Sequence, residues 1–234
     1  MHRLLEVGLP VYCGAPRTRY VALTFDDGPG PYTSLALHVL RRAGVHPTFF
    51  LVGRQVALYP RIARQEAALG TLGDHTWDHR FLVGLQRSAV TLELARTKAE
   101  ITQKTGARVQ LFRPPYGGHD RAIDRDAQAL GLLEVIWSVD STDSVPGPQT
   151  RWFRIAHVVD RFIRPGSIVL MHEDRGQTIA ALEFGILPEL RRRRLIPVTI
   201  PELLALDPPT MRQLRAGPHG CRGDGWSSTR STSS

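Results

Sequence analysis

VALTFDDGP, residues 21–29, joins a short apolar run to two consecutive acids and a tight turn. The run Val21–Phe25 is typical of a buried strand, and Gly28-Pro29 favours a loop directly after it. Neighbouring side chains at a strand end point in different directions, so Asp26 and Asp27 can face different partners. Two adjacent carboxylates cost free energy unless a cation lies nearby, which favours a metal ligand beside a free carboxylate over an ordinary turn.

A second polar motif, HTWDH at residues 75–79, follows about fifty residues later. On a helical turn this spacing places the imidazoles of His75 and His79 on one face, close enough to share a metal. An aspartate and two histidines give a divalent metal three protein ligands and leave positions open, as catalytic sites do. The second aspartate is then a candidate base for water that the metal activates. Asp78 is a candidate partner for an imidazole N–H.

Apolar runs of strand length alternate with segments of helical periodicity along most of the chain. Continuous apolar strands separated by helices indicate a parallel sheet with helices outside it, in a barrel-like α/β fold. The polar motifs follow strands directly, and the carboxyl ends of such strands open on one face, where active sites lie. Strands are expected at residues 21–25, 48–52, 111–112, 133–139, 167–171 and 197–200, and helices at 33–42, 60–69, 88–104, 124–130 and 201–206.

The length of 234 residues and the hydrophobic content of 42% are sufficient for one sizeable core. No run of eighteen apolar residues occurs, so no transmembrane segment is expected. Residues 1–14 lack the long apolar stretch of a secretory signal. We therefore expect an extracellular or cell-wall location if an export signal has been removed, and a cytoplasmic one otherwise.

The chain is basic, with a net charge of +8 from 30 basic and 22 acidic residues. Such a charge can attract an anionic surface, such as a bacterial wall or a nucleic acid. The densest basic run, Arg191–Arg194, has no interleaved aromatic residues on which bases could stack. A solvated basic exterior is the favoured interpretation, and no specific nucleic-acid binding is expected.

The two ends of the chain differ from its middle. Residues 1–19 precede the first strand and are expected to form an N-terminal extension, followed by a single domain over 20–207. Residues 208–234 are rich in Gly, Ser and Arg and are expected to form a flexible tail. Cys13 and Cys221 lie near opposite ends. Two free thiols are favoured, because a disulfide would require the ends to meet.

Five short motifs occur in the order found in the NodB-homology polysaccharide deacetylases, the family 4 carbohydrate esterases, which this chain resembles over about residues 20–205. The family's fourth motif continues with a tryptophan, and this chain has Ser144 at that position. The five motifs are T-F-D-D-G-P at Thr24–Pro29, H-[ST]-x-x-H at His75–His79, R-x-P-Y at Arg113–Tyr116, D-x-x-D at Asp140–Asp143 and L-x-H at Leu170–His172. The resemblance implies a distorted (β/α) barrel with seven or eight parallel strands, in a single domain.

The resemblance also implies a metal site and a base beside it. Asp27, His75 and His79 would bind one divalent metal, usually zinc, with cobalt, manganese or nickel as alternatives. Asp26 would be the general base, and Arg113 would orient it. A cation and an arginine nearby should keep Asp26 ionised and able to accept a proton from water.

The remaining motifs imply an acid and an oxyanion contact. His172 would be the general acid, supported by Asp143 in preference to Asp140, because an imidazolium can protonate a poor leaving amine. The backbone N–H of Tyr116 would stabilise the oxyanion. Ser144 would open or wet the wall of the acetyl pocket, and Trp137 or Trp152 are candidates to fill it. The residues expected to contact the substrate are Leu170, Tyr116 and Pro115.

The function that the resemblance implies is metal-dependent hydrolytic N-deacetylation of glycans that contain N-acetylglucosamine, with release of acetate. Peptidoglycan and chitin oligosaccharides are the expected substrates, and a monomer is the expected state. An O-acetyl esterase acting on acetylated xylan is the alternative. A non-catalytic carbohydrate-binding protein is less favoured, because Asp26 and His172 are both present.

Overall fold

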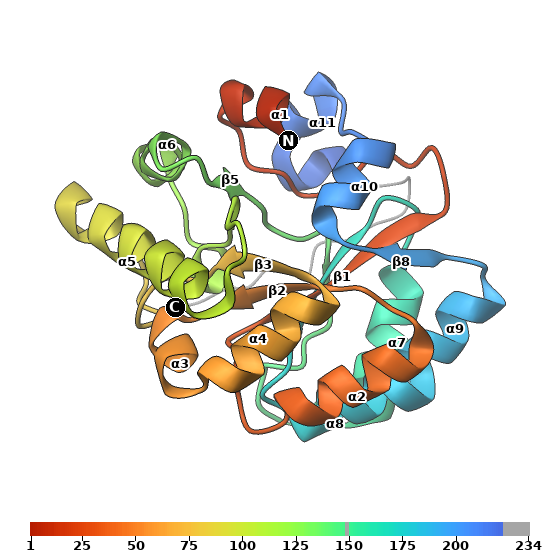
Figure 1. The fold of residues 1–234 in the computed structure, drawn as a ribbon. Helices are drawn as coiled ribbons and strands as arrows, with labels where there is room; N and C mark the ends of the chain where they lie inside the picture. The colour runs from red at the N-terminus through yellow and green to blue at the C-terminus, as the bar shows by residue number, and fades with distance from the viewer. Residues whose placement is uncertain (148–149, 222–234) are drawn as a thin grey trace.

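A parallel sheet, curled into a distorted half-barrel, forms the centre of the single domain (Figure 1). The structure is a computed structural model that describes residues 1–147 and 150–221. The strand order is β5-β4-β3-β2-β1-β7-β6, and β8 pairs with β1 outside this path. The predicted α/β fold with seven or eight parallel strands is therefore confirmed. The strands are β1 (Tyr20–Asp26), β2 (Thr48–Leu51), β3 (Thr71–Asp74), β4 (Leu111–Phe112), β5 (Leu133–Glu134), β6 (Val139–Asp140), β7 (Ile168–His172) and β8 (Ile196–Val198).

Strand β1 lies at the centre of the sheet and pairs with three others. Its second half pairs with β2, through Thr24 and Thr48 among others. Ala22 pairs with β7 on one side of β1 and with β8 on the other. Strand β8 therefore pairs with the first half of β1 along the same side on which β2 pairs with the second half. At the carboxyl end, Asp26 is in register with His172 of β7. Two residues 146 positions apart are thereby placed next to each other at one edge of the sheet.

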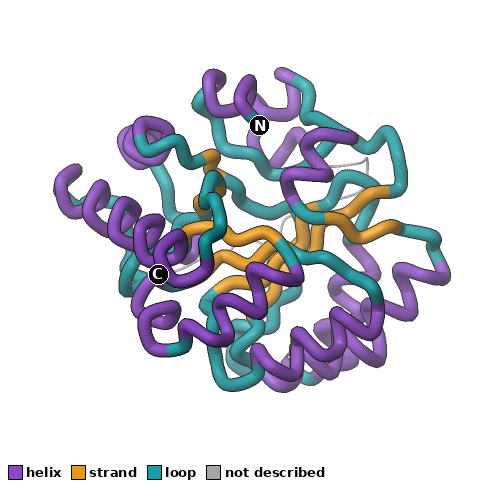
Figure 2. The backbone as a smooth tube through the Cα atoms, viewed as in Figure 1, coloured by secondary structure: helices purple, strands orange, loops and turns teal. Residues whose placement is uncertain are grey.

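The helices form an outer layer around the strands (Figure 2). In the described part of the chain, none of them is both long enough and apolar enough to cross a membrane. The segment from α8 to α9 is continuous through a π-helical stretch at Leu182–Ile186. The helices are α1 (His2–Val7), α2 (Thr33–Ala43), α3 (Gly53–Leu58), α4 (Pro60–Leu69), α5 (Arg87–Thr105), α6 (Arg121–Ala129), α7 (Trp152–Phe162), α8 (Gly176–Ala181), α9 (Leu187–Arg192), α10 (Ile200–Leu206) and α11 (Met211–Ala216).

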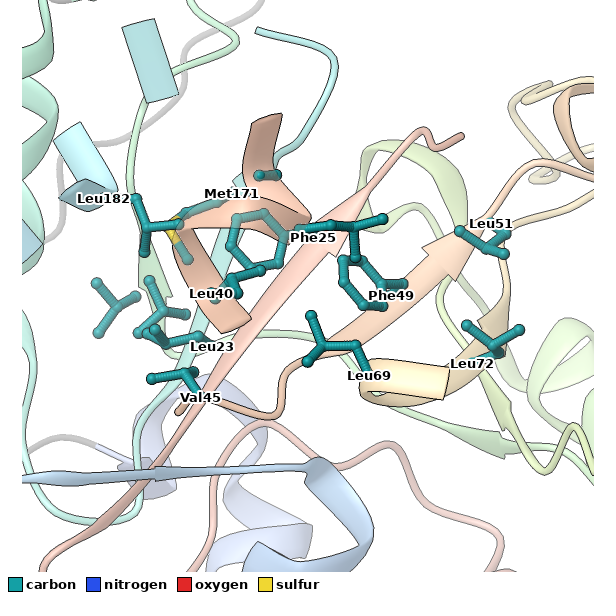
Figure 3. Packing of buried hydrophobic residues seen from close by; sticks show 14 of the residues in the cluster. Leu23, Phe25, Leu40, Val45, Phe49, Leu51, Leu69, Leu72, Met171 and Leu182 are labelled. Carbon is teal, nitrogen blue, oxygen red and sulfur yellow. The ribbon is translucent and has the colours of Figure 1, made fainter. Parts of the chain in front are cut away.

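The alternation of side chains along β1 divides the buried residues into two clusters. Leu23 and Phe25 point into the cluster that contains Leu40 of α2, where Phe25 packs 5.8 Å from Phe49 between ring centroids (Figure 3). Ala22 points the other way, into a second cluster that includes Leu203 and Leu204 of α10. Since side chains alternate with period two, Thr24 and Asp26 share the face of Ala22. This inner face is where the candidate site forms.

The two cysteines meet, contrary to the expectation of two free thiols. Cys13 and Cys221 form a disulfide with their Cα atoms 5.8 Å apart. Residues 211–216 form α11 and residues 217–221 form a 3₁₀ turn, so the predicted flexible tail is folded as far as Cys221. The rest of that predicted tail, 222–234, lies outside the described residues. The N-terminal extension is also packed, since Val11 is fully buried and bridges to Val135.

Several predicted element boundaries need correction. Helix α2 begins at Thr33 as predicted but ends one residue later, at Ala43, and the Thr33 hydroxyl accepts a hydrogen bond of 2.8 Å from the N–H of Gly30. The apolar run at 133–139 is divided between β5 and β6. The helices α1, α3, α7, α8, α9 and α11 were not among the predicted elements. Gly44 and Gly106 directly follow α2 and α5 in the left-handed conformation, with φ of 66° and 75°.

Candidate active site

Polar side chains from four strands converge at the carboxyl edge of the sheet. Asp26 ends β1 and His172 ends β7, while His75 directly follows β3 and Arg113 directly follows β4. All of these strands run parallel, so their carboxyl ends open on the same edge. Motifs that are far apart in the sequence are thus brought together by the topology of the sheet.

Asp27, His75 and His79 form a group suited to a metal ion. Nε2 of His79 lies 3.1 Å from Oδ1 of Asp27, and Nε2 of His75 lies 3.5 Å from the same oxygen. All the ligand atoms of the three residues fall within 4.8 Å of one another. Oδ1 of Asp27 is buried and accepts no hydrogen bond within the described residues. One carboxylate and two imidazoles with an unpartnered oxygen at their centre fit a divalent cation.

The charge of Asp27 is stabilised by its neighbours. Burial alone would raise the pKa of this carboxyl, but the adjacent imidazoles of His75 and His79, together with the nearby His172, hold the pKa below its usual range. Asp27 has a φ of 74°, so the chain turns sharply after β1 and directs this side chain toward the two histidines. An ionised carboxylate is the form that binds a metal.

The loop that carries the two histidines is not helical, contrary to the expectation from their spacing. Thr76 and His79 have positive φ values of 66° and 59°. A carboxylate oxygen of Asp74 accepts from the N–H of Thr76 at 2.9 Å, and the hydroxyl of Thr76 accepts from the N–H of His79 at 3.1 Å. Glu93 of α5 accepts from the N–H of Trp77 at 2.9 Å. Buried acids thus fix a loop geometry that the sequence spacing did not reveal.

His75 is oriented by the main chain and not by Asp78. Its Nδ1 lies 2.7 Å from the carbonyl oxygen of Arg113. A carbonyl can only accept, so Nδ1 carries the proton and Nε2 is free toward Asp27. Asp78 instead forms two hydrogen bonds of 3.1 Å with Arg80. The predicted contact between Asp78 and an imidazole is therefore wrong.

Asp26 is buried and held by Arg113. The guanidinium Nη1 of Arg113 donates to Oδ1 of Asp26 and to the hydroxyl of Thr24, both at 2.7 Å. Burial lowers the pKa of Arg113, and the carboxylate of Asp26 opposes that shift. The other oxygen of Asp26 lies 3.7 Å from Nε2 of His75. The remaining donors of the fully buried guanidinium bond to the carbonyl oxygens of Val135 and Ile136.

His172 is paired with Asp143 on the opposite side of Asp27. Nδ1 of His172 lies 2.7 Å from Oδ1 of Asp143, and the main-chain N–H of His172 donates to Oδ2 at 2.8 Å. Burial disfavours the charged ring, but Asp143 and the carboxylates of Asp26 and Asp27 raise the pKa of His172 to about 9. Nε2 of His172 points toward Asp27, 3.9 Å from its Oδ2.

The geometry distinguishes Asp143 from Asp140. Asp140 is exposed, and its side chain accepts from the N–H of Thr142 at 2.8 Å within its own loop. Asp143 is buried and also accepts from the hydroxyl of Thr178 at 2.7 Å. The role of Thr178 was not predictable from the sequence, because a threonine in a helical segment carries no signal of this contact. Of the two acids in the fourth motif, only Asp143 holds His172.

Tyr116, Pro115 and Leu170 surround these polar groups. Tyr116 adopts φ 60° and ψ 9°, and its ring is 70% exposed. The ring meets His79 edge-on, with 4.9 Å between centroids. Pro115 is buried at the start of the same 3₁₀ turn, and Leu170 is buried in β7 next to Thr24. These positions leave the tyrosine as an exposed edge beside the histidines.

Ser144 and the two candidate tryptophans occupy different surroundings. Ser144 is exposed. Trp152 stacks edge-on with Phe184, and Trp137 lies 5.7 Å from the guanidinium carbon of Arg113. A Cβ added to Gly117 would lie 2.9 Å from the Trp137 ring. Trp137 is therefore the tryptophan that supports the loop of Tyr116.

Two fully buried acids, Glu66 and Glu173, lie behind the loop that follows β1. A Cβ on Gly28 would come within 1.7 Å of Oε1 of Glu173 and 3.1 Å of Oε1 of Glu66, so only glycine fits there. Burial raises the pKa of Glu173 to about 8 and that of Glu66 well above its usual range. This pair was not predicted from the sequence, because Glu66 lies far from the motifs and Glu173 follows the fifth motif without belonging to it.

Comparisons with known proteins agree with this arrangement. The polysaccharide deacetylase family model matches residues 14–135. A peptidoglycan-N-acetylglucosamine deacetylase from Bacillus cereus is 35% identical over 194 residues, which cover 80% of this chain and 88% of that protein. A bifunctional xylanase/xylan deacetylase from Cellvibrio japonicus is 32% identical over 185 residues, or 79% of this chain, but the match spans only 27% of that longer protein.

A solved structure shows the same fold. The crystal structure of BA3943, a CE4 family pseudoenzyme from Bacillus anthracis, has a TM-score of 0.78 and 29% identity, covering 83% of this chain and 68% of that one. The family therefore includes a protein described as a pseudoenzyme, and membership alone does not assign activity. From the match to the family model, the identity to curated relatives and the shared fold, the chain belongs to the polysaccharide deacetylases of carbohydrate esterase family 4.

Proposed function

We propose that this chain is a metal-dependent deacetylase that hydrolyses the N-acetyl groups of N-acetylglucosamine units in peptidoglycan or chitin oligosaccharides. The proposal rests on one observation. Asp27 lies between two imidazoles suited to a metal, with Asp26 held by Arg113 on one side and His172 held by Asp143 on the other. Hydrolysis of an amide requires a base and an acid, and here they lie on either side of the residues suited to bind a metal.

Each residue has a distinct part in this proposal. A divalent metal such as zinc, held by Asp27, His75 and His79, would polarise the acetyl carbonyl and lower the pKa of water. Asp26 accepts the proton of the attacking water, and Arg113 keeps its carboxylate oriented for that step. The N–H of Tyr116 donates to the oxyanion as charge develops on it.

The pair of His172 and Asp143 favours an amide substrate over an ester. An amine is a poor leaving group and must be protonated as the C–N bond breaks. Asp143 supports the protonated form of His172, whose pKa is raised to about 9, so the imidazolium is present near neutral pH. His172 then gives its Nε2 proton to the departing nitrogen. Leu170, with Pro115 and Tyr116, would contact the acetyl group and the sugar.

An O-acetyl esterase acting on xylan is the second candidate. The relative from Cellvibrio japonicus is named a bifunctional xylanase/xylan deacetylase, and its match covers 79% of this chain. The same base and acid can serve an ester. We infer that the exposed Ser144, which stands in place of the family's tryptophan, allows other acetylated sugars into the site.

Acetate release from a substrate panel tests the function. The panel holds chitin oligosaccharides, peptidoglycan and acetylated xylan, each assayed with untreated protein, after complete chelation, and after zinc is restored. We expect release from the N-acetylated substrates that chelation abolishes and zinc restores. Activity that survives complete metal removal would overturn the mechanism. Binding of the glycans without acetate release, equal in wild type and Asp26→Asn, would instead identify a non-catalytic family member.

A further inference from the structure

A second group of side chains that could bind a metal shares no residue with the candidate active site. His119 follows the 3₁₀ turn of Tyr116, Asp124 lies in α6, and Glu134 ends β5. Nδ1 of His119 is 3.0 Å from Oδ1 of Asp124 and 3.2 Å from Oε1 of Glu134. The ligand atoms of all three lie within 4.8 Å of one another. One nitrogen and two carboxylates from three separate elements thus point to a common centre.

Glu134 lacks a partner that its burial would require. The residue is 4% exposed, and neither carboxylate oxygen accepts a hydrogen bond within the described residues, although His119 is close. Burial, and then the neighbouring carboxylates of Asp124 and Asp120, raise the pKa of Glu134 well above its usual range. A buried carboxylate without a partner is costly. A cation at this centre would satisfy Glu134 and relieve its repulsion with Asp124.

His119 is oriented for such a cation by Tyr12. Nε2 of His119 lies 2.9 Å from the hydroxyl of Tyr12. Burial, and then Glu134 and Asp124, raise the pKa of that phenol to about 12, so it stays neutral. If Nε2–H donates to the phenol oxygen, Nδ1 presents its lone pair to Asp124 and Glu134, as metal-binding histidines do. The opposite tautomer pairs Nδ1–H with Asp124 and leaves Glu134 without a partner.

We propose that His119, Asp124 and Glu134 form a second binding site for a divalent transition-metal ion, for which zinc is the probe. An imidazole with two carboxylates suits zinc, manganese or cobalt better than magnesium or calcium, which favour oxygen ligands. The site joins β5, α6 and, through Tyr12, the N-terminal extension next to Cys13. Its role is to stabilise the fold, because an ion that binds only the folded chain adds to its stability.

Zinc stoichiometry tests this site independently of the active site. Metal-free proteins are equilibrated with zinc, and bound zinc per chain is measured by mass spectrometry alongside the melting temperature. We expect two ions in wild type, one in Asp27→Ala, one in Glu134→Gln and none in the double variant. Zinc should raise the melting temperature of Asp27→Ala by more than about 2 °C and leave that of the double variant unchanged.

The controls separate a built site from general attraction to acids. Asp120→Asn removes a nearby exposed charge but no ligand, so it should keep both ions. Tyr12→Phe retains the three ligands and should weaken binding of the second zinc ion by about 10- to 100-fold. This variant still tests the site if Glu134→Gln folds poorly. No zinc bound to Asp27→Ala, or equal zinc bound to Asp27→Ala and the double variant, would overturn the proposal. Neither result would bear on acetate release by the wild type.

Discussion

The main-chain oxygen of Arg113 accepts a hydrogen bond of 2.7 Å from Nδ1 of His75. The guanidinium of the same arginine donates to Asp26, also at 2.7 Å. One residue therefore positions a proposed metal ligand through its backbone and the proposed base through its side chain. Since a substitution changes only the side chain, the two contacts can be separated by experiment.

Replacing Arg113 by lysine should reduce catalysis while sparing zinc binding. The carbonyl that orients His75 remains, but the two-point hold on Asp26 and Thr24 is lost, and lysine cannot reproduce the planar fork of arginine. We expect kcat to fall by about 100-fold, the lower end of the range that general acid–base catalysis contributes, because Asp26 remains but is misdirected. The zinc affinity measured by calorimetry should not change. Arg193→Lys, at a half-buried ion pair with Asp160, is the matched control. A parallel loss of zinc affinity would contradict this separation.

The two adjacent aspartates should respond differently to substitution. Asp26→Asn keeps all three proposed ligands but removes the base, so acetate release should fall by about 10²- to 10⁴-fold while zinc stays bound. Asp27→Ala removes the carboxylate that both imidazoles approach, so the zinc ion of the active site and the activity should be lost together. Zinc titration and acetate release on the same preparations measure both. Equal zinc loss in the two variants would show that the roles are not divided as proposed.

Thr178 should matter through its hydroxyl alone. The hydroxyl donates to Asp143 at 2.7 Å, and a hydrogen bond to a charged group contributes about 1.5–3 kcal/mol. Thr178→Val should leave Asp143 less well held and lower kcat for the N-acetylated substrate by about tenfold, whereas Thr178→Ser should retain near wild-type activity. Steady-state kinetics on both variants decides the point. Equal losses in valine and serine variants would indicate a packing role instead.

The motifs made the strand ends and most of the candidate site predictable. Asp26 and His172 end strands that pair in register, because strand and motif signals coincide there. The predicted helical arrangement of His75 and His79 is wrong. The conformation of their loop depends on Asp74 and Glu93, two buried acids that accept hydrogen bonds from main-chain N–H groups. Local patterns carry no information about such contacts between distant segments.

The same limit explains the other omissions. The contact of Thr178 with Asp143 spans 35 residues, and the Cys13–Cys221 bond spans 208. Neither distance leaves a periodic signal in the sequence. Short helices such as α3 and α8, six residues each, are too brief for a periodic pattern to identify. These features become visible only when the sheet fixes where each segment lies.

Stability should decrease as the pH rises, because of Glu173. An unfolded glutamate titrates near about 4.3, whereas the folded Glu173, buried against Glu66, titrates near about 8. Between these two pH values the folded state binds one proton more at Glu173 than the unfolded state does. The stability that this proton contributes is complete below about pH 4.3 and is lost as the pH rises through about 8. Urea unfolding from about pH 5 to about pH 9 should show the decline.

Glu173→Gln should make that decline smaller, because only Glu66 then remains of this buried pair of acids. The amide is neutral at every pH, so the variant should melt at least about 2 °C higher than wild type near pH 9. Glu6→Gln, at an exposed glutamate, should leave the decline unchanged. A wild-type profile that rises between neutral pH and pH 9 would contradict the assignment of a protonated buried acid.

The bond between Cys13 and Cys221 makes the polypeptide between them a covalently closed ring. Every residue proposed for catalysis and both proposed metal sites lie within that ring. A protease that cuts one peptide bond in a surface loop would therefore leave two polypeptides joined by the disulfide, without releasing a fragment. Two such cuts, or one cut and a reductant, are needed before any part of the site can separate from the rest.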